Sequence, residues 1–374
     1  MTEIIISGTG LYTPAYQITN AELVESFNRY VEHHNKRFAT DIKAGKISAL
    51  KPSSSEFILK ASGIQSRYVM DKQGILDIQT MHPVLPQRAD DQPSIQCEIA
   101  VQAAEQALAN ANKSAEEIDL VLCACSNMQR AYPAISIEVQ QALGISGYAY
   151  DLNVACSSAT FAIDAACNAI KNHQARAVLI INPEICSGHL NFQDRDSHFI
   201  FGDACTAMVV ENKQYSKSQD YFKILGCLLK TKFSNNIRNN FGFLTRAETS
   251  DHEIKEYLFV QNGRKVFKEV VPMVVNLIRQ HVDLLNLNLN DFQRFWLHQA
   301  NYHMNHMIGQ KLLGEEYSEE KVPSILEEYA NTSSAGSIIV FHKFHQDLPK
   351  NTLGLICSFG AGYSVGNVIV EKQK

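Results

Sequence analysis

Cys156 is the residue of this sequence best placed to act as a nucleophile. It lies in the segment Asp-Leu-Asn-Val-Ala-Cys-Ser-Ser-Ala-Thr, where an expected strand ends near Leu152 and an expected helix of small residues begins near Ala155. A helix N-terminus favours the thiolate over the thiol, because backbone N–H groups and the helix dipole stabilise negative charge. From the local sequence alone, a buried structural thiol is an equally good interpretation.

Two further polar residues lie where an expected strand and an expected helix meet. His298 follows the apolar segment Phe292–Leu297, and Asn331 precedes a helix of small residues that begins near Ser333. Such positions are frequent sites of catalytic groups in α/β proteins. Most single histidines are surface or core residues, and asparagine is also a good helix N-cap, so neither residue is diagnostic alone. The three side chains meet only if two parts of the chain pack with matching helix ends together.

The glycine-rich segment Ser358–Gly366 follows one expected strand and leads into another. A dinucleotide-binding loop needs a helix at that place, so that interpretation is rejected. A tight turn whose backbone N–H groups face an oxyanion fits the segment better. The chain contains no P-loop, no Gly-x-Ser-x-Gly motif and no His-Glu-x-x-His motif.

The hydrophobic pattern predicts an α/β fold in which the element order βαβαβαββ occurs twice. The first set of elements is expected at Thr2–Ser7, Ser94–Ala111, Asp119–Cys125, Pro133–Leu143, Gly147–Leu152, Ala155–Ile170, Ala175–Ile181 and Thr206–Glu211. The second set is expected at Phe222–Lys230, Gly263–Asn286, Phe292–Leu297, Gln299–Leu313, Lys321–Pro323 (a weak strand), Ser333–His345, Leu353–Ser358 and Ser364–Val370. The repeated order suggests a duplicated architecture.

A join near residues 212–220 divides the chain into two expected halves. The N-terminal half, 1–215, contains Cys156, and the C-terminal half, 216–374, contains His298 and Asn331. Residues 29–93 are polar and rich in Lys and Asp, which predicts an insertion with short helices that caps the surface of the N-terminal half.

Composition excludes several classes of protein. The 374 residues are 45% hydrophobic and 20% charged, which is typical of a globular protein. A net charge of −5 argues against a general nucleic-acid binder. No apolar run reaches the ~18 residues of a membrane span, and the N-terminus lacks the features of a signal peptide, so a cytoplasmic protein that binds no membrane is expected. Nine scattered cysteines without a Cys-x-x-Cys pair make a disulfide framework or a structural zinc site an unlikely interpretation.

Taken together, these residues resemble the β-ketoacyl-acyl-carrier-protein synthases of type III, which are condensing enzymes of the thiolase fold. Single motifs are weak, but their order along the chain is specific: Ile-Ser-Gly-Thr-Gly-Leu-Tyr-Thr-Pro (6–14), Ala-Ser-Gly-Ile-Gln-Ser-Arg (61–67), Val-Ala-Cys-Ser-Ser (154–158), Phe-Gly-Asp-Ala (201–204), His-Gln-Ala-Asn (298–301), Asn-Thr-Ser (331–333) and Phe-Gly-Ala-Gly (359–362). The resemblance implies a five-layered αβαβα arrangement of the duplicated halves. The chain more closely resembles a subgroup that condenses medium-chain acyl-CoA, such as octanoyl-CoA, to β-ketodecanoyl carrier protein.

The resemblance also implies a mechanism and partners. Cys156 would carry the acyl group taken from acyl-CoA, while His298 and Asn331 would stabilise the enolate formed when malonyl acyl carrier protein loses carbon dioxide. The backbone N–H groups of Cys156 and Ala361 would form the oxyanion hole. Acyl-CoA would serve as a substrate, with no metal or redox cofactor, and the family implies a homodimer.

Substrate contacts carry over from the family with some departures. Phe57 stands where a tryptophan usually stacks on the adenine of CoA, and His303 stands where an arginine is usual. The positions that match contacts to CoA or its pantetheine arm are Arg195, Gly263 and Lys268.

Arg264 and Lys268 share a helix face at i, i+4, so they could dock an acidic carrier protein, although a solvated basic face is an equal alternative. Tyr132 and Phe359 are the side chains expected to line or gate an acyl tunnel. Related enzymes that condense without decarboxylation take a glutamate from the loop equivalent to Ser126–Pro133, and this loop has no carboxylate.

Two alternatives remain from the sequence. One is a related condensing enzyme that makes a secondary metabolite or signal from acyl and malonyl thioesters. The other is a catalytically silent protein of the same fold that binds acyl thioesters or takes part in redox chemistry through its thiol.

Overall fold

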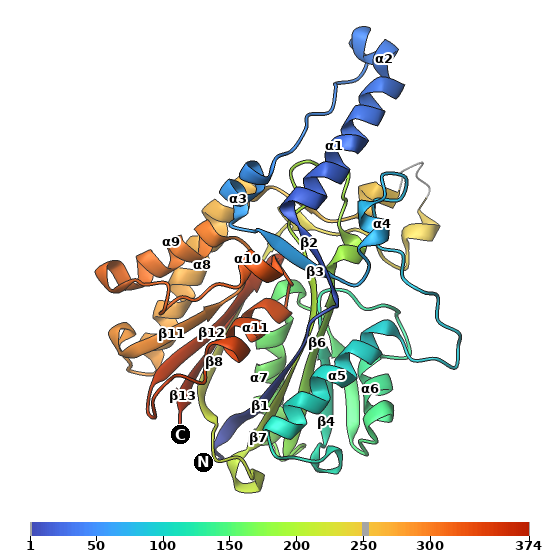
Figure 1. Cartoon of the computed structure of the whole chain (residues 1–374). Helices are drawn as coiled ribbons and strands as arrows, with labels where there is room; N and C mark the ends of the chain where they lie inside the picture. Colours follow the sequence, from blue (N-terminus) through green and yellow to red (C-terminus); the bar gives the residue numbers. More distant parts are fainter. Residues whose placement is uncertain (1, 249–253, 374) are drawn as a thin grey trace.

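Nine strands form one continuous mixed sheet in the computed structural model, which describes residues 2–248 and 254–373 (Figure 1). The order across the sheet is β11-β12-β13-β8-β1-β7-β6-β4-β5. Their bounds are Ile4–Tyr12 (β1), Leu120–Ala124 (β4), Tyr148–Leu152 (β5), Ala177–Ile185 (β6), Asp203–Asn212 (β7), Phe222–Ser234 (β8), Phe292–Leu297 (β11), Leu353–Gly360 (β12) and Gly362–Lys372 (β13). A short antiparallel pairing of β1 with β8, at Ile5–Lys223 and Ile6–Phe222, joins the strands of the two halves.

Helices cover the strands in three layers, which gives the predicted five-layered αβαβα arrangement (Figure 1). One outer layer contains α5 (Ile95–Asn110) and α6 (Ile135–Leu143), and the other contains α8 (Gly263–Leu284) and α9 (Tyr302–Leu313). The middle layer contains α7 (Ser158–Lys171) and α11 (Ala335–Lys343), which contact strands of both halves.

The alternation of side chains along β4 shows why the layers form. Leu120 and Leu122 pack in the core around α7 and α11, while Val121 and Cys123 pack against α5 and α6. Successive side chains of a strand point to opposite faces, so a strand that is apolar at every position needs a helical layer on each side. In the described part of the chain, no helix is long and apolar enough to cross a membrane.

The predicted element order is confirmed for the first half, in which β1, α5, β4, α6, β5, α7, β6 and β7 follow in sequence. One prediction for the second half is wrong, because Lys321–Pro323 forms no strand in the described structure. The carbonyl of Lys321 still accepts a hydrogen bond from the backbone N–H of Phe295 at 2.7 Å. Pro323 has no N–H to donate, which works against a longer ladder at this edge.

The segment between β1 and α5 contains β2 (Tyr16–Thr19), α1 (Asn20–Arg37), α2 (Ala39–Lys43), α3 (Ser55–Ser62), β3 (Ser66–Val69) and α4 (Gln73–Leu76). β2 and β3 pair with each other outside the main sheet. Helix α1 is longer than the short helices expected here, and it begins with a capping box between Thr19 and Glu22. In Figure 1, α1 projects from the body with α2 at its tip, and α3 lies at its base beside α8.

Two glycines of β1 allow the strand to pack tightly on α5. A Cβ atom on Gly10 would lie 2.0 Å from the carbonyl oxygen of Ala103, and one on Gly8 would lie 2.3 Å from that of Ala107. These obstacles are backbone atoms of a helix, so they cannot move aside as a flexible side chain would.

Gly10→Ala is therefore expected to lower the free energy of unfolding by about 1–3 kcal/mol or more, the usual cost of overpacking a core. Gly188→Ala is the matched control, because nothing lies within 4 Å of its added methyl group. Chemical denaturation of both variants measures the difference. Equal stability of the two variants would contradict the packing argument.

Candidate active site

Cys156 lies in a short 3₁₀ turn, Ala155–Ser157, between β5 and α7. The expected helix start at Ala155 is wrong by three residues, because α7 begins at Ser158. Ala155 has a φ of +48°, and its N–H donates to Oδ1 of Asn153 at 2.9 Å. The turn thus bends sharply before the helix and presents the thiol of Cys156 to a cavity that it lines.

His298 follows β11 directly and is 2% exposed. Its backbone N–H donates to the carbonyl of Cys357 on β12 at 2.7 Å, which continues the parallel pairing of the two strands. Its carbonyl accepts from the side-chain amide of Asn305 at 3.0 Å. The Phe359 ring lies edge-on to the imidazole, with 5.2 Å between the ring centroids.

Asn331 lies between α10 (Leu326–Tyr329) and α11 and is held on both sides by the backbone. Its N–H donates to the carbonyl of Ile200 at 3.0 Å, and its carbonyl accepts from the N–H of Gly202 at 3.1 Å. Its side-chain Oδ1 accepts from the N–H of Ser333 at 2.9 Å, which leaves the amide NH₂ as a donor. Asn331 is not the N-cap of α11, since that position belongs to Ser334.

Cys156, His298 and Asn331 all line one cavity of about 750 Å³. Most of its other walls are apolar, and they come from the inserted segment, the 196–201 loop, α8 and β12. Among them are Phe57, Phe199, Phe201, Ile237, Phe259, Val266, Phe267, Val270 and Phe359. A cavity of this size, apolar with a few converging polar groups, is typical of a small-molecule site.

The predicted substrate contacts divide into two groups. Phe57, Gly263 and Phe359 line the cavity, whereas Tyr132, Arg195 and Lys268 do not. Tyr132 is 84% exposed and does not line this cavity, and its role in lining or gating a tunnel stays a prediction. It lies on the loop between β4 and α6.

Arg195 does not line the cavity itself but stacks on Phe57, which does. Its guanidinium carbon lies 4.1 Å from the centroid of the Phe57 ring, and its Nε donates to the carbonyl of Pro52 at 2.8 Å. The neighbouring Asp196 lines the cavity. Arg195 and Phe57 together form a flat platform with one cationic face, which suits an aromatic or phosphate-bearing group.

The glycine-rich loop packs directly against Cys156. A Cβ on Gly360 would lie 2.6 Å from the Cβ and 3.0 Å from the Sγ of Cys156. The backbone N–H groups of Ala361 and of Cys156 itself hydrogen-bond to this sulfur. Ala361 also lines a separate hollow together with Asn153 and Phe233.

The side chains of Cys156 and His298 are both uncharged near neutral pH. Burial raises the pKa of the Cys156 thiol to about 11, against the opposing hydrogen bond from Ser333. Burial lowers the pKa of His298 to about 3, and the carbonyl of Ser333 only partly offsets this effect. The expectation that the helix terminus gives a low thiol pKa is therefore wrong, since desolvation is the larger effect.

Sequence reasoning missed two buried polar residues beside the thiol. Ser333 donates its hydroxyl to the Cys156 sulfur at 3.4 Å. Glu184, on β6, accepts hydrogen bonds from the backbone N–H and hydroxyl of both Ser126 and Ser334, and burial raises its pKa. A glutamate at the end of an apolar strand, in Asn-Pro-Glu, was the available signal.

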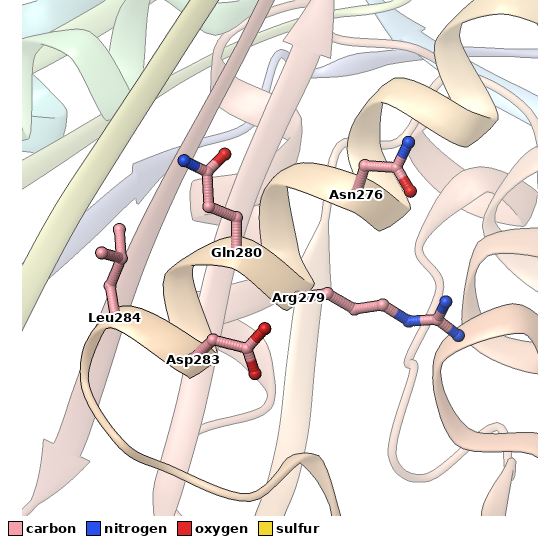
Figure 2. Close-up of a pocket in the computed structure, with 5 residues that line it drawn as sticks. All are labelled: Asn276, Arg279, Gln280, Asp283 and Leu284. Carbon is pink, nitrogen blue, oxygen red and sulfur yellow. The ribbon is translucent and has the colours of Figure 1, made fainter.

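A second hollow, of about 450 Å³, lies on α8 and is lined by Asn276, Arg279, Gln280, Asp283 and Leu284. In Figure 2 these side chains spread apart along the helix and do not converge on a common point. Arg279 is already engaged, because it donates to the carbonyl of Lys311 at 2.6 Å. None of the candidate catalytic residues lines this hollow.

Comparison with known proteins decides the family. Residues 150–231 match the family model of 3-oxoacyl-[acyl-carrier-protein] synthase III, and residues 282–372 match the model of its C-terminal part. The chain is 58% identical over 350 residues to a β-ketodecanoyl-[acyl-carrier-protein] synthase of Pseudomonas aeruginosa, with 94% of this chain and all of that protein covered. The chain belongs to the β-ketoacyl-acyl-carrier-protein synthase III family.

Other members of the family are more distant in sequence. A β-ketoacyl-[acyl-carrier-protein] synthase III of Brucella anthropi is 28% identical, with 85% of this chain and 91% of that protein covered. The crystal structure of a 3-oxoacyl-[acyl-carrier-protein] synthase III from Aquifex aeolicus superposes with a TM-score of 0.75 at 25% identity, covering 98% of this chain and 99% of the other. This synthase is therefore a condensing acyltransferase with the predicted thiolase-like fold.

The thiol pKa of about 11 predicts how the synthase reacts with iodoacetamide. Only the thiolate is alkylated, so the rate at Cys156 is expected to rise about tenfold per pH unit from about pH 7 to about pH 10. Peptide mass spectrometry follows Cys156 separately from the other cysteines, and Cys156→Ala confirms the assignment. A plateau below about pH 9 would contradict the raised pKa and show that the surrounding groups stabilise the thiolate.

Proposed function

We propose that this chain condenses a medium-chain acyl-CoA, with octanoyl-CoA as the first candidate, with malonyl acyl carrier protein. The observation that carries the proposal is the opening of a thiol, an imidazole and a carboxamide onto one largely apolar cavity. The name of the Pseudomonas relative supports the chain length, because octanoyl transfer and a two-carbon extension give a β-ketodecanoyl product.

The first stage forms an acyl-enzyme. The thiolate of Cys156 attacks the carbonyl carbon of the acyl-CoA, the bond from that carbon to the CoA sulfur breaks, and CoA leaves as its thiol after taking up a proton. The N–H groups of Cys156 and Ala361 stabilise the oxyanion of the tetrahedral intermediate. The proton lost by the Cys156 thiol balances the one that CoA takes up, and the imidazole of His298, whose pKa of about 3 makes it a weak base, stays neutral.

The second stage makes the carbon nucleophile by decarboxylation. The bond between the malonyl C2 and its carboxylate breaks, carbon dioxide leaves, and the electron pair passes into the thioester as an enolate. His298 and Asn331 donate hydrogen bonds to the enolate oxygen. The enolate carbon then attacks the acyl-Cys156 carbonyl and the thiolate leaves, which restores the enzyme without a resident metal or cofactor.

The proposed preference for a medium-chain acyl group follows from burial of its methylene groups. Octanoyl has six more methylenes than acetyl, and burial at ~0.8 kcal/mol each favours it by about 5 kcal/mol if the chain fits entirely in the cavity. Phe199, Phe201 and Phe259 supply apolar walls for it. The Arg195–Phe57 platform at the wall suits the adenine and phosphates of CoA.

A carrier protein is proposed to dock on α8. Arg264 and Lys268 are both exposed on one face of this helix, and Arg264 also lines the cavity. A carrier bound there would deliver its pantetheine arm past Gly263. We further propose a homodimer, because β5 is the edge strand of the sheet and presents Tyr148 and Tyr150, which are 42% and 40% exposed. A cytoplasmic location is a separate proposal that rests on membership of the family.

The acyl-enzyme is tested with a panel of acyl-CoA substrates from acetyl to dodecanoyl. Octanoyl-CoA is expected to leave a covalent adduct on Cys156, detected by intact mass and absent in Cys156→Ala. Shorter chains should react with lower kcat/KM because they bury fewer methylenes. Failure of every acyl-CoA to form an adduct would reject the proposed function.

The roles of His298 and Asn331 are separated from that of the thiol by His298→Ala and Asn331→Ala. Each variant is expected to form acyl-Cys156 but to release carbon dioxide from malonyl carrier protein about 10²–10³-fold more slowly, the usual cost of one lost donor. Radiolabelled malonyl groups measure the release. Comparable loss of both steps would show that these residues act in acylation too.

The malonyl donor separates the two candidate functions. A preference of the wild-type enzyme for malonyl-CoA over malonyl carrier protein would favour an enzyme that makes a secondary metabolite or signal.

A further inference from the structure

Ser333 contacts all three candidate catalytic residues at once. Its hydroxyl donates to the sulfur of Cys156 at 3.4 Å, and its backbone N–H donates to Oδ1 of Asn331 at 2.9 Å. Its carbonyl faces the imidazole of His298. One residue on the loop before α11 thus links groups that come from both halves of the chain.

The conformation of Ser333 is unusual. It has a φ of +49°, in the left-handed region that favours glycine, and it is 1% exposed. A serine held in this region stores backbone strain, which persists only where surrounding contacts hold the residue in place. The neighbouring Ser334 uses its hydroxyl differently, on the carbonyl of Ala124 and on Glu184, so the strained residue is the one turned to the thiol.

We propose that Ser333 is a positioning residue of the condensing site, whose hydroxyl stabilises the Cys156 thiolate while its backbone orients Asn331 and His298. The inference deepens the proposed function and rests on it for the identity of the nucleophile. A hydroxyl donor directed at sulfur favours the ionised form, because the thiolate accepts a stronger hydrogen bond than the thiol.

Other groups around the sulfur bear on its ionisation as well. The carboxylate of Glu184 disfavours the thiolate through its negative charge, while the N–H groups of Ala361 and Cys156 favour it. The buried thiol of Cys186 lies close enough to interact with Cys156 electrostatically, and His298 lines the same cavity. Among these groups, the Ser333 hydroxyl is a side-chain donor that a single substitution removes without changing a charge.

Ser333→Ala tests the role of the hydroxyl through the pH profile of iodoacetamide alkylation at Cys156. Loss of the donor is expected to move the profile to higher pH, so that the rate at about pH 8 falls about tenfold for each unit by which the pKa rises. Release of carbon dioxide from malonyl carrier protein should change less than acylation does. Ser337→Ala is the matched control, because this buried hydroxyl on α11 bonds Ser358 and not Cys156.

Ser333→Gly separates this role from a merely structural one. Glycine relieves the strain at φ +49°, so the melting temperature is expected to equal or exceed that of the wild type, while the alkylation profile still moves to higher pH. Wild-type alkylation profiles in both folded variants would overturn the inference.

The two proposals fail in different ways. Alkylation measures the thiol without any substrate, so a shifted profile in Ser333→Ala supports the positioning role even if no acyl-CoA reacts. If octanoyl-CoA acylates wild type and both Ser333 variants at equal rates at every pH, the proposed function stands and the role of Ser333 is rejected.

Discussion

Desolvation of the sulfur is the constraint on which the rest of the active site depends. Burial of Cys156 beside a largely apolar cavity raises the pKa of its thiol to about 11. Only hydrogen-bond donors offset that effect, and they come from the turn itself, from Ala361 and from Ser333. The close approach of Gly360, where a side chain would collide with Cys156, follows from the same need to bring donors to the sulfur.

The duplicated architecture explains how these donors are collected from distant parts of the chain. Helices α7 and α11 share the middle layer, and each follows a turn that carries a candidate catalytic residue. Glu184 holds the start of α11 against the loop after β4 through its bonds to Ser334 and Ser126. A buried carboxylate with four hydrogen bonds is satisfied in place, and it ties the two halves together next to the thiol.

The inserted segment contributes part of the cavity wall. Helix α3 brings Phe57 to the cavity wall and is tied to the start of α9, where Asn301 donates to the carbonyl of Ala61 and His303 bonds the carbonyl of Lys60. Part of the cavity wall therefore comes from a segment outside the βαβαβαββ repeat. This arrangement is typical of α/β enzymes, in which a rigid core carries the chemistry and added loops select the substrate.

Features set by neighbouring residues could be predicted from the sequence, whereas features set by contacts between residues far apart in the chain could not. Hydrophobic periodicity predicted nearly every element of the five layers, and the ordered motifs indicated the family together with Cys156, His298 and Asn331. Local patterns did not reveal the strandless edge at Lys321–Pro323 or the exposed position of Tyr132, because tertiary packing decides both. The raised thiol pKa and the central place of Ser333 also depend on tertiary structure, since burial and a contact 177 residues apart in sequence leave no local signal.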